Sequence, residues 1–487
     1  MNKKSIINNN QYLLLIAISI IVGMMNVVYC TNRSITMIFV LLEVLILIYL
    51  FASRKYIDYL GMYILFCGLS NEYEKLIGND AFYGFKNTRI LGVNLGILAL
   101  LPLFVVAFRK ISIDNNSLYG KFYKYFMLLQ VCALIIGFTL VVVNDNGVQA
   151  FSNVFGLFFE NLYVMSAQQI LLATIFLFFV NNCIIEDLVK IEDYFLCLLI
   201  GVISGLVFSF VSGKQGVYGG VQTLMASNNV RWLPMMFLLP IYPKYKNKIS
   251  IWILGLVGAV LVLAYNSTGK MIIMYYIVPI IYFAINIKSK QYKRAISILL
   301  LFPLILFVLM FGANYFAESN ILFRNKLSQT LSIINYINGN VGVDEVSSSP
   351  RVRILEIRNI LIEYFNKPWL VVLGKGFFGT VKNYTGMRYT TGAYSIDQWR
   401  IGLFYRMHES FSKLLLCNGL SGVVFLVTQL YRGVKNISKT PWGAVGLYWL
   451  LICYGHSITM TAFGFSCFLY SIIQVDVFNE RELYSHI

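Results

Sequence analysis

The chain has 487 residues, of which 58% are hydrophobic and only 13% are charged. Soluble proteins carry about 25% charged residues, so this composition excludes a soluble enzyme and indicates a protein that crosses the membrane many times. The formal net charge of +17 comes largely from lysines and arginines that lie between apolar stretches. No polar stretch resembles a nucleic-acid-binding fold, so we expect no nucleic-acid partner.

Apolar stretches long enough to cross a bilayer follow one another through residues 1–311. The stretch at 57–69 is short and contains Gly61 and Gly68, which makes it the weakest of them. We predict about 11 transmembrane helices in this region, near residues 12–29, 35–51, 57–69, 90–108, 122–143, 165–180, 194–211, 230–242, 251–265, 271–287 and 295–311.

The C-terminal region, residues 410–487, is apolar again. One helix is predicted near 411–430, and the stretch 442–477 is long enough for two helices with a break near 456–464. The whole chain is therefore predicted to be an all-α polytopic membrane protein with roughly 12–14 transmembrane helices.

Positive charge between the predicted helices sets the orientation. With the N-terminus in the cytoplasm, most of the basic residues between helices fall on the cytoplasmic side, as the positive-inside rule requires. The C-terminus is then cytoplasmic, and the long polar interval at 312–409 lies outside the cytoplasm as one large loop domain. Basic residues outnumber acidic ones in this loop, which suggests an anionic substrate.

An amphipathic helix is predicted near residues 350–366 of the loop. Ser349 is placed to cap it, Pro350 suits its first position, and Lys367-Pro368 ends it. At about 100° per residue, Arg351 and Arg358 share one face, while Arg353 lies nearly opposite, within reach of Glu356. Two interpretations remain open: a helix on the bilayer surface with its arginines among headgroups, or arginines that clamp a lipid phosphate.

The rest of the loop contains a Gly-X-Gly turn and then a run of basic residues. Lys375 lies in Gly374-Lys375-Gly376, and Arg400, Arg406 and His408 follow before the next apolar stretch. His408 stands beside Glu409 and could accept a proton from a sugar hydroxyl. It could equally form a hydrogen bond to headgroups or to the loop backbone.

Two further basic residues lie at membrane entrances on the same side. Lys270 follows the turn Asn266-Ser267-Thr268-Gly269 and either extends to the interface or helps to bind a diphosphate. Arg231 stands beside Trp232 and is either an interfacial anchor or a second phosphate ligand.

Arginines, an amphipathic helix, a Gly-X-Gly turn and a His at the mouth of a membrane helix resemble the large loop of the O-antigen polymerase and ligase family. The resemblance implies a GT-C-like fold in a bacterial inner membrane. It implies a glycosyltransferase that needs no metal or cofactor and uses undecaprenyl-diphosphate-linked oligosaccharide, with His408 matching the family's required His. Lys270 stands where the family commonly has Arg.

The resemblance favours a Wzy-type polymerase that joins repeat units into O-antigen of lipopolysaccharide or into capsule. A flippase and a chain-length regulator of the same pathway would be partners. A ligase that transfers polymer to lipid A core is the sibling alternative. A flippase or other transporter is the alternative from another class, disfavoured because Glu43 is a rare charge inside the spans. Glu72 and Glu74 resemble the acidic pair of metal-dependent enzymes.

Overall fold

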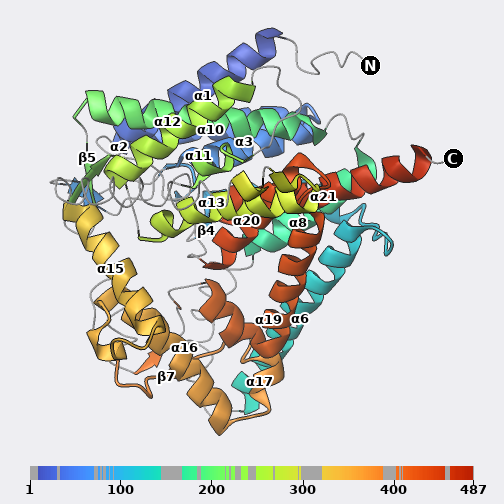
Figure 1. Cartoon of the computed structure of the whole chain (residues 1–487). Helices are drawn as coiled ribbons and strands as arrows, with labels where there is room; N and C mark the ends of the chain where they lie inside the picture. Colours follow the sequence, from blue (N-terminus) through green and yellow to red (C-terminus); the bar gives the residue numbers. More distant parts are fainter. Residues whose placement is uncertain are drawn as a thin grey trace.

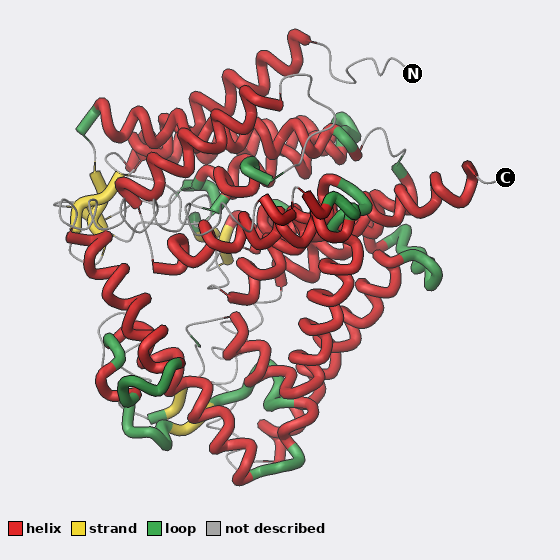
Figure 2. Tube along the Cα trace, in the orientation of Figure 1, coloured by secondary structure: helices red, strands yellow, loops and turns green. Residues whose placement is uncertain are grey.

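The protein is described here by a computed structural model in which helices dominate (Figures 1 and 2). It describes residues 9–29, 33–70, 75–76, 79–80, 84–86, 88–90, 93–143, 167–183, 188–213, 215–218, 221–224, 232–239, 248–266, 269–293, 295–297, 321–387, 402–404, 407, 410–455 and 461–485.

One group of apolar helices runs side by side in the upper part of Figure 1. The group consists of α1 (Asn9–Tyr29), α2 (Arg33–Ala52), α3 (Tyr56–Leu69), α10 (Lys190–Val211) and α12 (Lys248–Asn266). Small residues let these helices approach closely. A Cβ on Gly61 would overlap the ring of Tyr194, and a Cβ on Gly23 would overlap the backbone of Gly201. Gly61 and Gly68 made the predicted helix at 57–69 look weak. In the structure they allow α3 to pack closely against α10.

A second group contains α8 (Gln168–Asn182), α13 (Gly269–Lys288), α20 (Pro441–Gly455) and α21 (Thr461–Ser485). The helices α20 and α21 confirm the two predicted for 442–477. Glu192 of α10 joins the two groups, because its Oε1 accepts hydrogen bonds from Trp442 Nε1 at 2.9 Å and Tyr470 Oη at 2.8 Å.

The helices α6 (Leu118–Val143) and α19 (Ser410–Asn436) run obliquely from this body to the lower part of Figure 1. Large apolar side chains stay exposed on α6, among them Leu128, Ile135 and Phe138, and α2 exposes a similar set. Contiguous exposed apolar surface of this kind is what lipid covers in a membrane protein.

Within the described residues, four helices are long and apolar enough to cross a membrane, namely Ser34–Ala52, Leu118–Val141, Lys190–Val211 and Ser410–Asn436. Seven shorter apolar helices accompany them. The prediction of a mostly helical membrane protein is therefore confirmed.

Two predicted membrane helices differ from the structure in their described parts. The helix predicted at 90–108 is found only from Leu95 to Phe108, where it is broken into α4 (Leu95–Leu98) and α5 (Leu101–Phe108), and the strands β3 (Arg89–Ile90) and β4 (Val93–Asn94) pair antiparallel before it. The break is stabilised from α3, because the hydroxyl groups of Tyr59 and Tyr63 donate to the carbonyls of Ala99 and Gly96.

The other is the predicted helix at 230–242. Only the single turn α11 (Leu233–Met236) is helical among its described residues, and Pro234 within that turn has no N–H to donate. Most of the predicted helix at 295–311 lies outside the described residues.

A small sheet departs from the all-α prediction. Its strands are β1 (Lys75–Leu76), β2 (Asn79–Asp80), β5 (Gln215–Tyr218) and β6 (Val221–Leu224), in the order β2-β1-β5-β6. Leu76 pairs with Gly216, so two connections far apart in sequence meet. Their pairing requires that both connections lie on the same side of the membrane.

The loop forms the lower part of Figure 1 and has its own core. Its elements are α15 (Ile321–Ile337), the 3₁₀ turn η3 (Val343–Glu345), α16 (Ser348–Asn366), α17 (Leu370–Leu373), β7 (Val381–Lys382) and β8 (Leu403–Phe404). The strands β7 and β8 pair antiparallel. Buried side chains of α16 meet Leu415 and Leu416 of α19 in this core, so the loop is packed onto a membrane helix.

Candidate functional site

The helix α19 is interrupted one third of the way along its length. Gly419 has φ of 57° and ψ of −145°, outside the helical region. A break frees carbonyl groups that need other donors, since no water is available inside a membrane. The break in α19 therefore has to be stabilised by its neighbours.

The loop supplies those donors. Lys375 N donates to Leu416 O at 2.8 Å, and Gly376 N donates to Cys417 O at 2.9 Å. Tyr364 Oη, from α16, donates to Leu415 O. The loop is thus bonded directly to the backbone of the interrupted helix.

The Gly-Lys-Gly turn makes this contact sterically allowed. Gly374 and Gly376 have φ of 73° and 68°, which favours glycine. A Cβ on Gly376 would overlap the backbone of Ala133 and Gly137 in α6, and Phe377 N donates to Ala133 O at 3.1 Å. The turn is therefore wedged between α6 and α19, and its glycines have a structural role.

The ammonium group of Lys375, predicted to bind substrate, forms an internal ion pair. Its Nζ lies 2.9 Å from Glu363 Oε1 and 2.6 Å from Thr380 O. Tyr384 Oη donates to the other oxygen of Glu363. Burial alone would raise the pKa of the Glu363 carboxyl, but the hydrogen bonds from Lys375 and Tyr384 outweigh it and hold the pKa below its usual range. The charge of Lys375 is thus neutralised within the loop.

The helix α16 begins earlier than predicted. Its first residue is Ser348, and Ser347 rather than Ser349 is in the cap position. The Ser347 side chain makes no capping bond but lies 3.1 Å from Ser332 Oγ of α15. Lys367-Pro368 follows the last helical residue, Asn366, as predicted.

The buried face of α16 carries Val352, Leu355, Asn359 and Glu363, spaced three or four residues apart. This face packs inside the loop, so protein rather than lipid covers it. Leu361 and Phe365 of the same helix stay exposed, so the bilayer-surface interpretation remains a prediction for that part of the helix.

The three predicted arginines lie away from the buried face of α16. Arg351 and Arg353 are half-buried, and Arg358 is exposed. Arg358 Nη2 donates to Tyr336 Oη of α15 at 3.0 Å. The arginines therefore lie at the surface of the loop, with Arg358 held against α15.

A polar pocket lies beside the interruption of α19. It is a partly open hollow between α6, α8, α19 and α20. Its polar lining consists of Gln130, Gln169, Ser410, Lys413 and Asn418, and Phe377 of the loop closes one side. Asn418 Nδ2 donates to Leu129 O at 3.2 Å across the pocket wall. Amides, a hydroxyl and a cation thus line one hollow where the loop meets the membrane helices.

The cation in this pocket is Lys413, which is only 1% exposed. It lies one turn into α19, and an ionisable residue at such a position in a membrane helix indicates function. Sequence reasoning missed it because residues 411–430 were taken as a uniform apolar stretch. A lysine within that stretch, followed by Asn418-Gly419, was the signal that could have revealed the site.

Several predicted site residues lie outside the described part of the chain. These are Arg231, Arg400, Arg406 and His408, as well as Glu72 and Glu74. Lys270 lies in the first turn of α13, and its side chain is outside the description. Arg406 and His408 come immediately before Ser410, a residue of the polar pocket, in the sequence.

Among the described residues, no group of three His, Cys, Asp or Glu side chains is placed to hold a metal ion. No protein-family profile and no curated protein matches this chain.

Proposed function

We propose that the protein transfers an oligosaccharide from a polyprenyl diphosphate to an acceptor sugar, as a polymerase of lipid-linked repeat units. The membrane helices would have a GT-C-like arrangement, and the 312–409 loop would lie outside the cytoplasm. The observation that carries the proposal is the Lys413 pocket, which lies beside a broken membrane helix and against the loop.

A lipid diphosphate fits the position and chemistry of this pocket. The donor's chain is membrane-bound, and its charged head needs cations and hydrogen-bond donors near the membrane boundary. Lys413 and the amides of Gln130 and Gln169 supply these groups. In the sequence, Arg406 and His408 precede Ser410, a residue of the pocket, by only a few residues.

The proposed reaction is a single displacement of the diphosphate. The acceptor hydroxyl oxygen attacks the anomeric carbon of the donor, and the bond from that carbon to the diphosphate oxygen breaks. The proton of the hydroxyl passes to His408, and the diphosphate leaves on its polyprenyl chain. Lys413 would stabilise the negative charge that develops on the leaving oxygen.

Arg351, Arg353 and Arg358 would act on the surface side of the loop. Their placement away from the core of α16 leaves them able to meet an anionic or sugar-rich substrate. Lys375 is assigned no contact with substrate in this proposal, because Glu363 already neutralises it.

The test uses purified full-length protein in liposomes with undecaprenyl-diphosphate-linked repeat units, and products are separated as a gel ladder. We expect Lys413→Gln to lower the rate by about a hundredfold, the range for loss of one charge-stabilising group. Lys413→Arg should restore part of it. Lys435→Gln, which removes an exposed cation at the other end of α19, should leave the ladder unchanged.

A ladder that is the same with Lys413→Gln would contradict the assignment of this pocket. Polymer attached to lipid A core, when that acceptor is supplied, would identify a ligase instead of a polymerase.

A transporter is the second candidate, and a specific observation favours it. Interrupted helices with polar pockets also form transport sites, and Glu192, Asp193 and Lys413 are buried in addition to Glu43. The sequence argument that Glu43 is a rare charge inside the spans overlooked Lys413, which lies within the predicted helix at 411–430. Movement of the lipid-linked unit across the liposome without any new glycosidic bond would select the transporter.

A further inference from the structure

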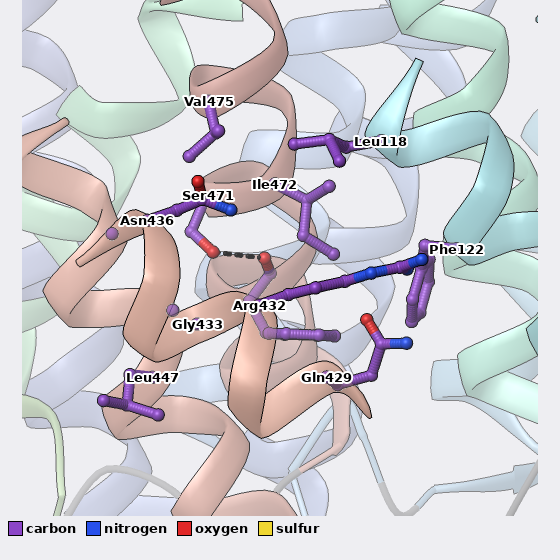
Figure 3. A pocket seen from close by; sticks show the side chains of 13 residues that line it. Leu118, Phe122, Gln429, Arg432, Gly433, Asn436, Leu447, Ser471, Ile472 and Val475 are labelled. Atoms are coloured by element: carbon purple, nitrogen blue, oxygen red, sulfur yellow. Dashed lines mark hydrogen bonds between the residues drawn. The ribbon is translucent and has the colours of Figure 1, made fainter. Parts of the chain in front are cut away.

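A second pocket lies near the opposite end of α19, away from the loop. Figure 3 shows Arg432 extending across it toward Phe122, with Gln429 beside it. The pocket is formed by α6, α19, α20 and α21 and is partly open to the outside. Its lining consists of Leu118, Phe122, Gln429, Arg432, Gly433, Asn436, Gly443, Gly446, Leu447, Phe468, Ser471, Ile472 and Val475.

Two hydrogen-bond donors in this pocket have no acceptor. Within the described part of the chain, Gln429 Nε2 and Arg432 Nη1 are both buried and unpartnered. Gln429 is only 3% exposed. Leaving such donors unpaired costs about 1–3 kcal/mol each, so the arrangement indicates a ligand with acceptor oxygens.

The described residues around the pocket do not supply the missing acceptor. None of the lining residues, all of which the structure describes, is acidic. The carboxylate of the neighbouring Asp476 accepts from Leu118 N and Tyr119 N, each at 2.8 Å. A guanidinium group can only donate hydrogen bonds, and its planar fork matches the oxygens of a phosphate.

The rest of the pocket is suited to hydrocarbon. Phe122, Leu447, Phe468 and Ile472 are among the lining side chains. Gly446 allows α20 and α21 to approach, since a Cβ there would overlap Ser471. A ligand that fits both parts has a negatively charged head and an apolar body, which excludes sugars and simple metal ions.

We propose that this pocket binds an anionic phospholipid, with the lipid phosphate on Arg432 and Gln429 and the upper part of its acyl chains against the apolar wall. This site is separate from the Lys413 pocket, so the proposal stands whether or not the protein transfers sugars. Lys288 of α13 adds positive charge near this end of α19, where its Nζ donates to Val434 O at 2.9 Å.

The test measures binding to the purified full-length protein in a neutral detergent, by native mass spectrometry and by the shift in melting temperature. The ligands are dioleoylphosphatidylglycerol, diolein, which has the same chains without phosphate, and inorganic phosphate. We expect the phospholipid to bind and stabilise, and diolein not to. Arg432→Gln should weaken phospholipid binding about tenfold or more, the effect of losing a charged hydrogen bond.

Lys435→Gln is the matched control, because it removes one positive charge from the same helix outside the pocket. It should change binding by less than about twofold. Gln429→Leu keeps the size of the side chain and should weaken binding by a smaller factor than Arg432→Gln, which gives a second reading if Arg432→Gln does not fold.

Equal phospholipid binding by wild type, Arg432→Gln and Gln429→Leu would overturn the proposal. Stabilisation by inorganic phosphate that depends on Arg432, with no further gain from phosphatidylglycerol, would show that the site takes a free anion and not a lipid. If neither phosphatidylglycerol nor inorganic phosphate binds, water is the partner of the Gln429 and Arg432 donors, and the proposal is also overturned.

Discussion

The two ends of α19 differ in how their polar groups are paired by hydrogen bonds. At the loop end, the carbonyls around the break at Gly419 accept hydrogen bonds from Tyr364, Lys375 and Gly376. At the far end, donors of Gln429 and Arg432 have no acceptor among the described residues. The backbone carbonyls at the break are therefore paired where the loop docks, although the buried hydroxyl of Ser412 has no partner there among the described residues, whereas the unpaired groups at the far end are strong donors that include a cation.

Lys375 and Arg432 show what this difference means for finding sites. Lys375 looked like a ligand because it lies in a Gly-X-Gly turn of a basic loop, yet Glu363 neutralises it. Arg432 looked like an ordinary basic residue at a helix end, yet its guanidinium has an unpaired N–H in a pocket. The partner of a cation, more than its place in the sequence, separates a structural role from a binding role.

The largest effect is expected where the loop touches α6. Gly376→Ala should destabilise the docked loop by about 4 kcal/mol or more, because it combines a left-handed φ with overlap against the backbone of α6. Protease cleavage of the loop in purified protein would measure this as faster cutting.

Gly386→Ala is the matched control for that change. Gly386 also has a positive φ, of 63°, but no atom lies within 4 Å of the position of its Cβ. Its cost should be limited to the backbone strain of about 1–2 kcal/mol. Equal cleavage rates for the two variants would show that the turn is not wedged between the helices.

The next effect concerns the ion pair in the loop. Glu363→Gln should destabilise the loop by about 3 kcal/mol, because it leaves the ammonium of Lys375 buried without a counter-charge. The double variant Glu363→Gln with Lys375→Met should regain most of this loss in the same cleavage assay. A double variant no more stable than Glu363→Gln alone would mean that the charge of Lys375 is not what Glu363 compensates.

Acid should remove the same contribution reversibly. The pKa of Glu363 is lowered in the folded loop, so its contribution is present above the unfolded pKa of about 4.3 and is lost as the pH falls through the lower folded value. Opening of the loop, measured by amide hydrogen exchange corrected for the intrinsic exchange rate at each pH, should stay constant from pH 8 to about 5 and rise below about 4. Glu363→Gln should show a smaller rise, and an identical acid profile would contradict this assignment.

The fold was predictable where apolar length alone decides it. The stretches that became α1, α2, α6, α10 and α19 were all predicted, because long hydrophobic runs in a membrane have to be helical. The break between α4 and α5 was missed because it depends on hydrogen bonds from another helix. The hydroxyl groups of Tyr59 and Tyr63 in α3 donate to the carbonyls of Ala99 and Gly96.

The site was less predictable because it depends on partners. The sequence could place Arg351 and Arg358 on one face of a helix, since that needs only its period. It could not show that Glu363 would reach Lys375 across twelve residues of chain. Nor could it bring Gln130 and Gln169 to Lys413, since the three come from different helices.

The smallest effect on stability is expected at Arg432. Like Lys375, Arg432 is half-buried. Arg432→Met keeps the apolar stem and removes a guanidinium whose Nη1 has no acceptor. Removing a cation without a partner sacrifices no ion pair and relieves desolvation, so stability in lipid-free detergent should stay within about 0.5 kcal/mol or rise. Lys375→Met alone should be destabilising, because the buried Glu363 carboxylate then keeps only the hydrogen bond from Tyr384 and the more exposed cation of Lys367, 3.5 Å away. Melting curves of the two variants, recorded side by side without phospholipid, compare these outcomes directly. An equally large loss in both would mean that Arg432 has a structural partner and that the two ends of α19 do not differ in the way described.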